Sequence, residues 1–443
     1  MKIAVIGGGI AGLSAAWLLC RRHDVSLYEG AGRLGGHANT VDVALHGETV
    51  PVDAGFIVYN EHNYPHLTRL FDALDVATVA SNMSFAISLN GGRFEYAGSS
   101  RGLFAQPSNV LRPTFWQLVR DLLRFYRSAP SFAARHDLDA MTLGDLLRQG
   151  GYSDLLARRH ILPMAAAIWS SKLTDILDFP ARTFVQFFEN HGLFSLGERP
   201  QWRSVLGGSR NYVDALAAPF RDNVHLATPV TALRRTPAGV FVRDNTGHEQ
   251  RFDEVVVAAH ANQALAMLGD GASDAERRIL GAFRYQENDA VMHSDTALMP
   301  RRRRAWSSWN YMSDGCLDDL DQVSVSYWMN RLQRLPTNHD VFVTLNPERQ
   351  PSRDLTHAAF TYHHPQFDKA ALDAQHELPT IQGYDRIWFC GSYCGYGFHE
   401  DGLQAGIAVA EAFGVTPPWA NDVTPMSPAW RAVMPATPAM AAE

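Results

Sequence analysis

The stretch "KIAVIGGGIAGLSAAWLLC", residues 2–20, decides the fold of this chain. It opens with "KIAVI", a short apolar run of the kind that forms buried parallel strands. Gly7, Gly9 and Gly12 follow in a G-x-G-x-x-G pattern, and "LSAAWLLC" then reads as a helix. Gly7 allows a tight turn, Gly9 lets a pyrophosphate approach the backbone, and Gly12 lets the helix pack on the strand. The stretch predicts a strand, a phosphate-binding turn and a helix of the Rossmann type.

A targeting segment is the alternative interpretation, because residues 3–20 form an uncharged run as long as a membrane-spanning helix. The glycines at 7, 8 and 9 would interrupt such a helix. Leu19 also stands where a signal peptide needs a small residue before its cleavage site. We therefore favour the strand, turn and helix.

Residues after the first glycines complete a dinucleotide-binding pattern. The helix begins near Ile10 and Ala11, whose free N–H groups can face phosphates. A second strand, "DVSLYE", ends in Glu29 and is followed by Gly30. The Glu29 carboxylate has the spacing needed to accept hydrogen bonds from a ribose diol. Strand, glycines, helix, second strand and acid come in the order that dinucleotide binding requires.

A longer cradle favours FAD over NAD. "GRLGGHANT" follows Glu29 almost at once and brings a second glycine pair, Gly35 and Gly36, next to Arg33 and Leu34. Arg33 can meet phosphate or flavin oxygens, and "VPVDAGF" then returns Gly55 to the same place. A plain solvated turn is the alternative for the glycine pair. An extended FAD makes more use of this second approach than NAD does.

A second glycine-rich stretch, "CGSYCGYGFHEDGLQAG" at residues 390–406, lies near the other end of the chain. It follows the apolar run "RIWF" and leads into a helical pattern. His399, Glu400 and Asp401 could suggest a metal site, but adjacent residues do not converge on one ion without further ligands. We predict no metal. The helix that starts near Gly402 would direct its positive end at a flavin.

These motifs resemble the flavin-containing amine oxidase superfamily, which includes phytoene desaturases and protoporphyrinogen oxidases. The resemblance rests on "GGGIAGLSAAWLL", "LYEGAGRLGGHANT" and "VDAGF". It implies an α/β fold, in which a Rossmann-type FAD-binding domain is interrupted by a substrate domain of mixed sheet and helices. It also implies that Val230 in "ATPVTAL" meets the adenine side of FAD and that Gly391 reaches the pyrophosphate. The remaining contacts that it implies lie under the flavin ring, at Glu400, Asp401, Gly402, Leu403 and Gln404.

The cofactor is expected to be FAD held without a covalent bond. No cysteine falls where some family members attach the flavin, although Cys394 is expected near the ring. The cofactor motifs divide the chain into a discontinuous FAD-binding domain, a discontinuous substrate domain and a loosely ordered tail. We predict their bounds as 1–55, 206–285 and 379–416 for the first, 56–205 and 286–378 for the second, and 417–443 for the tail.

A narrower resemblance covers nearly the whole chain and concerns the substrate. "AAAIWSS", "WRSVLGGSRNYVDAL" and "GFHEDGL" are similar to a bacterial subgroup of FAD-dependent oxidoreductases. Its genes often neighbour cyclopropane-fatty-acid-synthase-like methyltransferases. The resemblance implies hydride transfer between flavin N5 and an apolar substrate, such as a fatty acyl chain of a membrane lipid. The alternatives are an amine oxidase, a carotenoid-type desaturase, and a flavin-binding accessory subunit of a lipid methyltransferase partner.

The resemblance also suggests three catalytic residues. Amine oxidases of the superfamily carry a lysine in a substrate-domain strand, and this chain has "NDAVMHSDTALMPRRRRAW" there, without the lysine. His293 is the nearest polar replacement, unless it is a buried histidine satisfied by the backbone. His399 takes the place of an aromatic wall beside the flavin, with Tyr396 close by. A neutral imidazole at either position could handle protons during turnover.

Composition limits the partners. The net charge of −7 and the pI of about 6.2 give no basic excess that would favour nucleic acid. Four cysteines in 443 residues form no disulfide framework, so a cytoplasmic location is expected.

Two segments suggest contact with the inner face of a membrane. The segment "FWQLVRDLLRFYR" has an apolar helical stripe next to arginines, which favours a core helix or one that rests on a bilayer. The stripe consists of Phe115, Leu118, Val119, Leu122 and Tyr126. Arg301–Arg304 form either a solvated loop or a contact with phosphate head groups.

Overall fold

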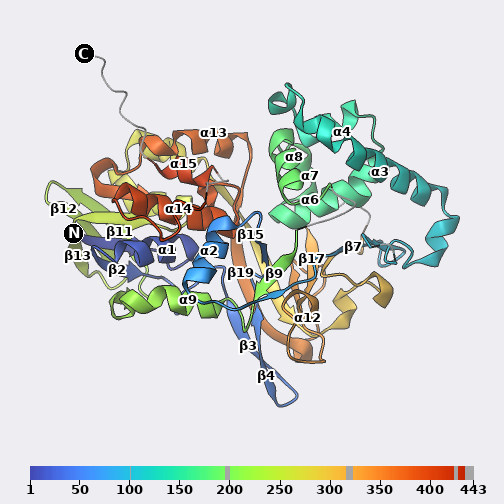
Figure 1. Ribbon diagram of the computed structural model, residues 1–443, viewed down its shortest axis with the longest axis horizontal. Helices are drawn as coiled ribbons and strands as arrows, with labels where there is room; N and C mark the ends of the chain where they lie inside the picture. The colour runs from blue at the N-terminus through green and yellow to red at the C-terminus, as the bar shows by residue number, and fades with distance from the viewer. Residues whose placement is uncertain (100, 195–199, 316–322, 424–427, 435–443) are drawn as a thin grey trace.

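The computed structural model describes residues 1–99, 101–194, 200–315, 323–423 and 428–434. A parallel sheet lies on the left in Figure 1, a helical lobe lies at the upper right, and the strands of a second sheet run beside and below that lobe. The predicted α/β architecture, with a Rossmann-type unit and a mixed second unit, is confirmed.

The parallel sheet has the strand order β10-β2-β1-β14-β20. Its bounds are Val224–His225 for β10, Asp24–Tyr28 for β2, Lys2–Ile6 for β1, Glu254–Val257 for β14 and Ile387–Phe389 for β20. Neighbouring strands are parallel throughout, and β1, β2 and β14 are buried apart from the first residue of each. This burial explains why the strands are continuous apolar runs rather than alternating ones.

Two helices pack together beside this sheet. Every residue of α1 (Ile10–Leu19) is buried, which explains why the run had the composition of a membrane segment. α1 lies against α14 (His399–Ala412), which is also buried from Glu400 to Ala410. A side chain at Gly406 would overlap Ser14 and the carbonyl of Ala11, so only glycine allows this close crossing.

The second unit contains a seven-stranded mixed sheet in the order β19-β15-β18-β17-β16-β7-β8. In chain order its strands are β7 (Phe85–Leu89), β8 (Phe94–Ala97), β15 (Arg284–His293), β16 (Trp309–Met312), β17 (Ser324–Trp328), β18 (Phe342–Leu345) and β19 (Thr356–Gln366).

A helical lobe packs against one end of that sheet and shares a hydrophobic core with β7, β8, β16 and β17. Its helices are α3 (Pro113–Ala133), α4 (Leu143–Gln149), α5 (Asp154–Leu156), α6 (Leu162–Trp169), α7 (Leu173–Leu177) and α8 (Ala181–Asn190).

The remaining strands and helices complete the described part of the chain. The strands are β3 (Thr40–Leu45), β4 (Glu48–Asp53), β5 (Tyr59–Asn60), β6 (Thr78–Ala80), β9 (Trp202–Val205), β11 (Val230–Thr236), β12 (Gly239–Asp244) and β13 (Glu249–Phe252). The helices are α2 (Pro65–Ala73), α9 (Arg210–Ala217), α10 (Ala261–Leu268), α11 (Asp274–Gly281), α12 (Met329–Leu332), α13 (Lys369–Glu377) and α15 (Ala429–Val433).

The prediction of a loosely ordered tail is wrong for the described part of residues 417–443. Trp419 is buried and stacks on Trp17 of α1, with ring centres 6.1 Å apart. Its indole N–H donates to Nδ1 of His66 over 3.2 Å. Residues of α15 join the same core. The apolar side chains among the prolines and alanines provide enough burial to hold the segment.

The apolar stripe of α3 belongs to the interior. Phe115, Leu118 and Tyr126 are buried in the core of the helical lobe, and Val119 and Leu122 pack against it. The bilayer interpretation of this stripe is therefore wrong, and its alternative, a core helix, is right. No helix in the described part of the chain combines the length and the apolar character needed to cross a membrane.

Candidate active site

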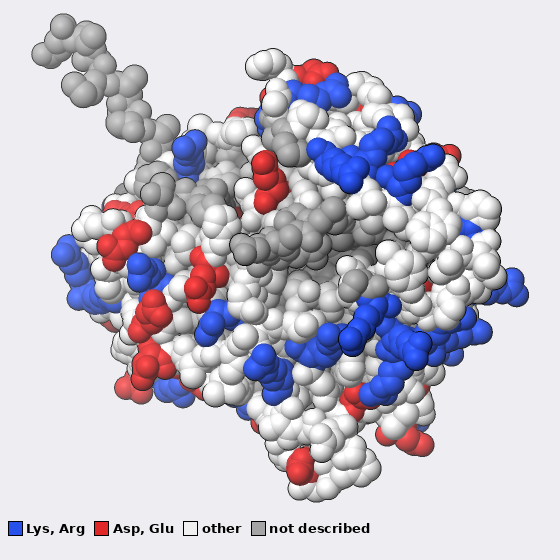
Figure 2. All heavy atoms as spheres, turned by 45° about the vertical axis from the view of Figure 1, so that its right-hand side comes forward, with Lys and Arg blue, Asp and Glu red and all other residues white. Residues whose placement is uncertain are grey.

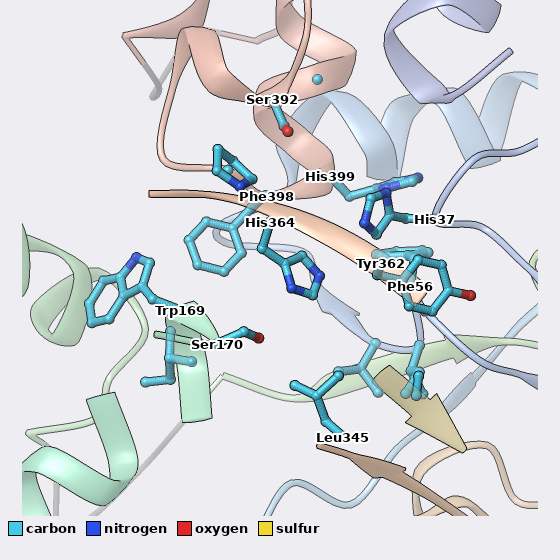
Figure 3. A pocket seen from close by; sticks show the side chains of 18 of the residues that line it. His37, Phe56, Trp169, Ser170, Leu345, Tyr362, His364, Ser392, Phe398 and His399 are labelled. Atoms are coloured by element: carbon cyan, nitrogen blue, oxygen red, sulfur yellow. The ribbon is translucent and has the colours of Figure 1, made fainter. Parts of the chain in front are cut away.

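A cavity of about 1140 Å³ lies between the two units. Backbone of the glycine-rich turns lines one end, and side chains from the seven-stranded sheet and from α6 and α8 line the other. Figure 3 shows part of the wall, with Trp169 and Phe398 on one side, Phe56 and Tyr362 on the other, and His364 between them. The cavity brings together segments that lie hundreds of residues apart in the sequence.

The predicted glycines at positions 7, 9, 30, 35, 36, 55, 391 and 402 all line this cavity. Gly7 has φ +111°, and a side chain there would collide with the carbonyl of Ala258. A Cβ on Gly9 meets no heavy atom within 4 Å, although the residue is the N-cap of α1. Gly9 is thus a position where the protein itself leaves room for a side chain. That room is what a bound pyrophosphate would need.

Gly12 has a different role from Gly9. It does not line the cavity, and a Cβ there would overlap the carbonyl oxygen of Gly7. Ile10 and Ala11, at the first turn of α1, do line the cavity. The N-cap carries no side-chain bond to the first N–H groups, so those groups can receive an anion.

Glu29 stands at the end of β2 and lines the cavity, as expected for a ribose contact. One carboxylate oxygen accepts from the Gly8 N–H over 2.6 Å, and the other accepts from the Ala31 N–H over 2.8 Å. These two bonds fix the carboxylate and leave lone pairs for further donors. Val230 lines the same end, next to Gly30 and Pro229.

Arg33 and Leu34 do not line the cavity. The Arg33 guanidinium donates to the carbonyls of Leu34, Gly36 and Ala38, and so fastens its own loop. This arrangement holds Gly35 and Gly36 in place. The guanidinium of Arg33 thus shapes the glycine turn, and its predicted contact with cofactor oxygens stays a prediction.

His399, the first residue of α14, lines the cavity and is partly buried. Its Nε2 lies 2.6 Å from the hydroxyl of Tyr212. Burial lowers the pKa of His399 to about 3, with a smaller contribution from His37. The imidazole is therefore neutral at ordinary pH and accepts from the tyrosine. The expected proton transfer by His399 near neutral pH does not fit this environment.

Tyr396 also lines the cavity, and burial raises the pKa of its phenol. His293 does not line the cavity. It is fully buried, its Nε2 lies 2.7 Å from the hydroxyl of Thr344, and its Nδ1 accepts from the Asp295 N–H. The neighbours of Thr344 in β18, Val343 and Leu345, line the cavity, so His293 faces the opposite side of the sheet. The prediction of a catalytic His293 is wrong.

Glu400, Asp401, Leu403 and Gln404 do not line the large cavity. Glu400 accepts from the N–H groups of His66 and Leu67, at the start of α2, and from Gln404. Asp401 accepts from the Phe398 N–H and caps α14. These carboxylates therefore join and cap helices behind the cavity, and their direct contact with the cofactor stays a prediction.

Several lining residues were not predicted from the sequence. His364 of β19 lines the cavity beside Phe398 and Tyr362, and its Nδ1 lies 3.0 Å from the Asn288 amide. Burial lowers the pKa of His364 to about 4. Its motif, "YHHPQF", carries a usable signal, which is a pair of histidines before a proline. Trp169 and Ser170, from "AAAIWSS", are a second such case.

A buried histidine bridges two tyrosines at the other end of the cavity. His160 Nδ1 lies 2.8 Å from the Tyr96 hydroxyl, and its Nε2 lies 2.9 Å from the Tyr126 hydroxyl. All three residues line the cavity. Because both ring nitrogens are engaged, the bridge holds strand β8, helix α3 and the turn before α6 together.

The described cysteines stay out of the cavity. Cys390 and Cys394 are fully buried, and burial raises the pKa of both thiols. Cys20 lies at the end of α1, and Cys316 lies outside the described residues. Within the described ranges, no group of three or more His, Cys, Asp or Glu side chains could hold a metal ion.

Comparison with known proteins identifies the class. The model of the family "Flavin containing amine oxidoreductase" matches residues 10–283. The chain belongs to this family of flavin-dependent oxidoreductases, and its cofactor is FAD.

The chain is 23% identical over 264 residues to the flavin-containing amine oxidase A of Canis lupus familiaris, which covers 58% of this chain and 49% of that protein. It therefore spans about half the length of that relative. Cyclohexylamine oxidase from Brevibacterium oxydans shares the fold with a TM-score of 0.66 at 15% identity, over 93% of this chain and 99% of that one. A fatty acid isomerase from P. acnes does so with a TM-score of 0.62 at 15% identity, over 93% and 98%.

The residues present fit FAD. The open side of Gly9, the uncapped start of α1 and the fixed Glu29 carboxylate suit a dinucleotide. Gly391 and Gly402 bring further backbone to the cavity from the segment that follows the carboxyl end of β20. No described cysteine lines the cavity.

Proposed function

We propose that the protein transfers a hydride between FAD and an apolar chain that carries an anionic group, such as a fatty acid or an acyl chain of an anionic lipid. One observation carries the proposal. Among the described residues that line the cavity, three arginines stand against a single acid, Glu29, which lies at the nucleotide end. The arginines are Arg101, Arg304 and Arg331.

The cavity walls suit a hydrocarbon chain. Large apolar side chains from α6, α8 and the seven-stranded sheet line it beyond the glycine turns. They include Met83, Phe85, Met164, Ile168, Phe187, Val343, Leu345 and Phe367. Burying methylene groups against such walls contributes roughly 0.8 kcal/mol for each group. These side chains lie away from the glycine turns that would hold the nucleotide end of FAD. The cavity is therefore larger than that end of the cofactor requires.

The arginines would bind the charged end. Arg331 is half-buried, donates to the Trp306 carbonyl, and has a pKa lowered by burial, so an anion nearby would relieve its desolvation. Arg101 and Arg304 are exposed at the cavity surface. Guanidinium groups bind carboxylate and phosphate through paired N–H donors.

The same charges disfavour a protonated amine as substrate. Among the described lining residues, an ammonium group entering this cavity would meet three cations and no carboxylate beyond the nucleotide end. The amine oxidase alternative is therefore weaker, despite the family name. The fatty acid isomerase with the same fold supports the lipid proposal by its name, since it shows that the fold can serve a fatty acid.

Bound FAD supplies the hydride chemistry, and the protein's own residues orient the substrate and exclude water. Phe56, His399 and Tyr362 form a neutral wall near the start of α14. Two indole N–H groups, of Trp169 and Trp309, line the cavity and are buried with no hydrogen-bond partner among the described residues. They could donate to oxygen atoms of a bound substrate.

The experiment mixes the FAD-loaded protein anaerobically with oleate, with dioleoyl phosphatidylglycerol and with oleylamine. The flavin absorbance is followed from the oxidised state and, separately, from the dithionite-reduced state. Oleate or the phospholipid should change it, and oleylamine should not. Arg331→Gln should weaken oleate binding by about tenfold or more, as expected for loss of a hydrogen bond to a charged group.

Arg303→Gln is the matched control, because Arg303 pairs with Asp340 and does not line the cavity. A response to oleylamine alone would overturn the proposal in favour of an amine oxidase. No response to any probe, together with co-purification of a methyltransferase, would favour the accessory-subunit alternative.

A further inference from the structure

We propose that a small exposed surface beside the cavity docks the protein on an anionic phospholipid bilayer. The surface consists of Phe104, Val110, Leu111 and Trp116, and we refer to it as the 104–116 surface. It lies on the turn before α3 and on the first turn of that helix. It is separate from the buried stripe of α3.

The four side chains of the 104–116 surface are strongly exposed to solvent, although they are large and apolar. The exposed fractions are 42% for Phe104, 42% for Val110, 85% for Leu111 and 46% for Trp116. The rings of Phe104 and Trp116 lie 6.4 Å apart, so the side chains are neighbours and not isolated. Contiguous exposed apolar groups of this kind mark interaction sites.

The surface is held in place by hydrogen bonds, so its exposure is built into the fold. The Trp116 indole N–H donates to the Val110 carbonyl over 2.9 Å. Arg112 donates to the Arg93 carbonyl and to the Asn109 side chain. Asn109 in turn is buried and donates to the Glu95 carbonyl. These bonds present Leu111 outward.

The exposed charge around the 104–116 surface is positive. The sequence from 90 to 127 contains six arginines and two acids, Glu95 and Asp121. Both acids are buried, at 0% and 5% exposure, whereas Arg93, Arg101 and Arg120 are exposed. Glu95 is also neutralised by Arg302, one of the four consecutive arginines. Figure 2 shows basic side chains gathered on the right-hand half of this face, with few acidic ones.

The arginine run at 301–304 is therefore not simply a solvated loop. Arg302 is committed to Glu95, and Arg303 pairs with Asp340. Arg304 lines the cavity. Arg301 lies against the turn at Gly92. Arg301–Arg304 therefore contact residues next to the 104–116 surface, Gly92 and Glu95, and also reach the cavity.

The 104–116 surface adjoins the cavity. Gly98, Ser99, Arg101 and Gly102 line the cavity, and the surface begins two residues later at Phe104. An apolar chain leaving a bilayer here would pass from one apolar environment to another. This entry route rests on the proposed function, whereas docking itself does not.

A bilayer fits these observations better than a second copy of the chain. A symmetric pairing of this surface would place arginines against arginines, because both partners present the same patch. An anionic bilayer offers both an apolar phase for Leu111 and Trp116 and phosphate charge for the arginines.

The test is co-sedimentation of the FAD-loaded full chain with vesicles. Vesicles of phosphatidylglycerol and phosphatidylcholine should bind the protein, and vesicles of phosphatidylcholine alone should bind it weakly. The double variant Leu111→Gln/Trp116→Gln should bind at least about tenfold more weakly, since it removes the inserting side chains. Added salt should also weaken binding, because it screens exposed charge.

The matched control is Leu226→Gln/Leu355→Gln, which changes two leucines exposed to 42% and 40% elsewhere on the molecule. It should bind like the parent. Equal binding by the 104–116 variant and the parent would overturn the proposal, as would absence of binding to anionic vesicles. Self-association lost in the 104–116 variant would overturn it in favour of a second copy.

Flavin reactions with oleate below its aggregation limit separate this proposal from the proposed function. The 104–116 variant should react with dissolved oleate like the parent and react more slowly with phospholipid in vesicles. If the parent protein binds vesicles but its flavin responds to none of the probes, the docking proposal stands and the proposed function is wrong.

Discussion

The ring of His399 lies flat on the ring of Phe56, with centres 3.9 Å apart and planes inclined by 11°. Phe56 follows the glycine turn at Gly55, and His399 begins α14, so the contact joins two segments of the cofactor end. The Tyr212 hydroxyl holds the histidine from the side. His399 thus acts as a fixed wall of the cavity, with a neutral imidazole.

The Tyr212–His399 bond gives the first prediction. His399→Phe should keep the stack on Phe56 but leave the buried Tyr212 hydroxyl without its acceptor, which costs about 1–3 kcal/mol. Adding Tyr212→Phe should recover part of that loss. Urea unfolding of the parent, the two single variants and the double variant measures the coupling. Additive losses would show that the bond contributes nothing to stability.

Flavin content tests the role of Gly9. Gly9→Val should fold, because its backbone is extended and a Cβ meets nothing within 4 Å. The valine would occupy the pyrophosphate path, so the purified variant should be colourless. Gly271→Val is the control, since its Cβ also meets nothing and it does not line the cavity. A yellow Gly9→Val protein would show that the phosphate site lies elsewhere.

The buried carboxyl group of Glu400 should make the free energy of unfolding depend on pH. Burial raises its pKa to about 8, even though three groups donate to the carboxylate. Between the unfolded pKa near 4.5 and the folded value, the folded state holds the proton and the unfolded state releases it. Stability contributed by Glu400 is therefore fully present below about pH 4.5 and falls by up to about 1.4 kcal/mol per pH unit as the pH rises towards 8.

The measurement compares thermal unfolding of the parent and Glu400→Gln from pH 5 to pH 9. The variant should lose less stability over this interval, because its side chain does not titrate. Glu189→Gln, at an exposed position of α8, should follow the parent. Parallel curves for all three proteins would mean that Glu400 is ionised throughout.

Substitutions of Trp419 test whether the described part of residues 417–443 contributes to stability. Trp419→Ala should reduce the free energy of unfolding by about 3–5 kcal/mol, the usual cost of removing a buried tryptophan. Trp419→Phe should cost much less, since a phenyl ring can still pack on Trp17 and only the bond to His66 is lost. Similar, small losses in both variants would mean that the tail contributes little.

The cofactor end could be predicted closely from the sequence because its signals are local. Gly7, Gly9 and Glu29 owe their roles to backbone geometry within one strand, turn and helix. The same holds for the strand and helix around Gly391 and Gly402. The loop contacts of Arg33 could not be predicted in this way, because a guanidinium can reach carbonyls of its own loop as easily as a ligand.

The substrate end could not be predicted in this way, because its wall depends on long-range strand pairing. His293 and Ala290 lie on the same strand, β15, yet Ala290 lines the cavity and His293 does not. Alternation puts side chains three residues apart on opposite faces of a strand, but only the folded sheet shows which face meets the cavity. Arg101, Arg304 and Arg331 come from three distant segments that only the folded chain brings together.

The order of strands in the parallel sheet has a consequence for biosynthesis. Strand β20 lies beside β14, and α14 packs on α1, yet β20 and α14 leave the ribosome long after β1 and α1. The nascent chain therefore exposes the apolar face of α1 for most of its synthesis, and it exposes the edge of β14 from the time that this strand is made until β20 follows. Contacts of such large sequence separation form slowly. We expect that chaperones protect the first half of the chain and that FAD associates only after release, so flavin supplied late should rescue apoprotein that has already been made.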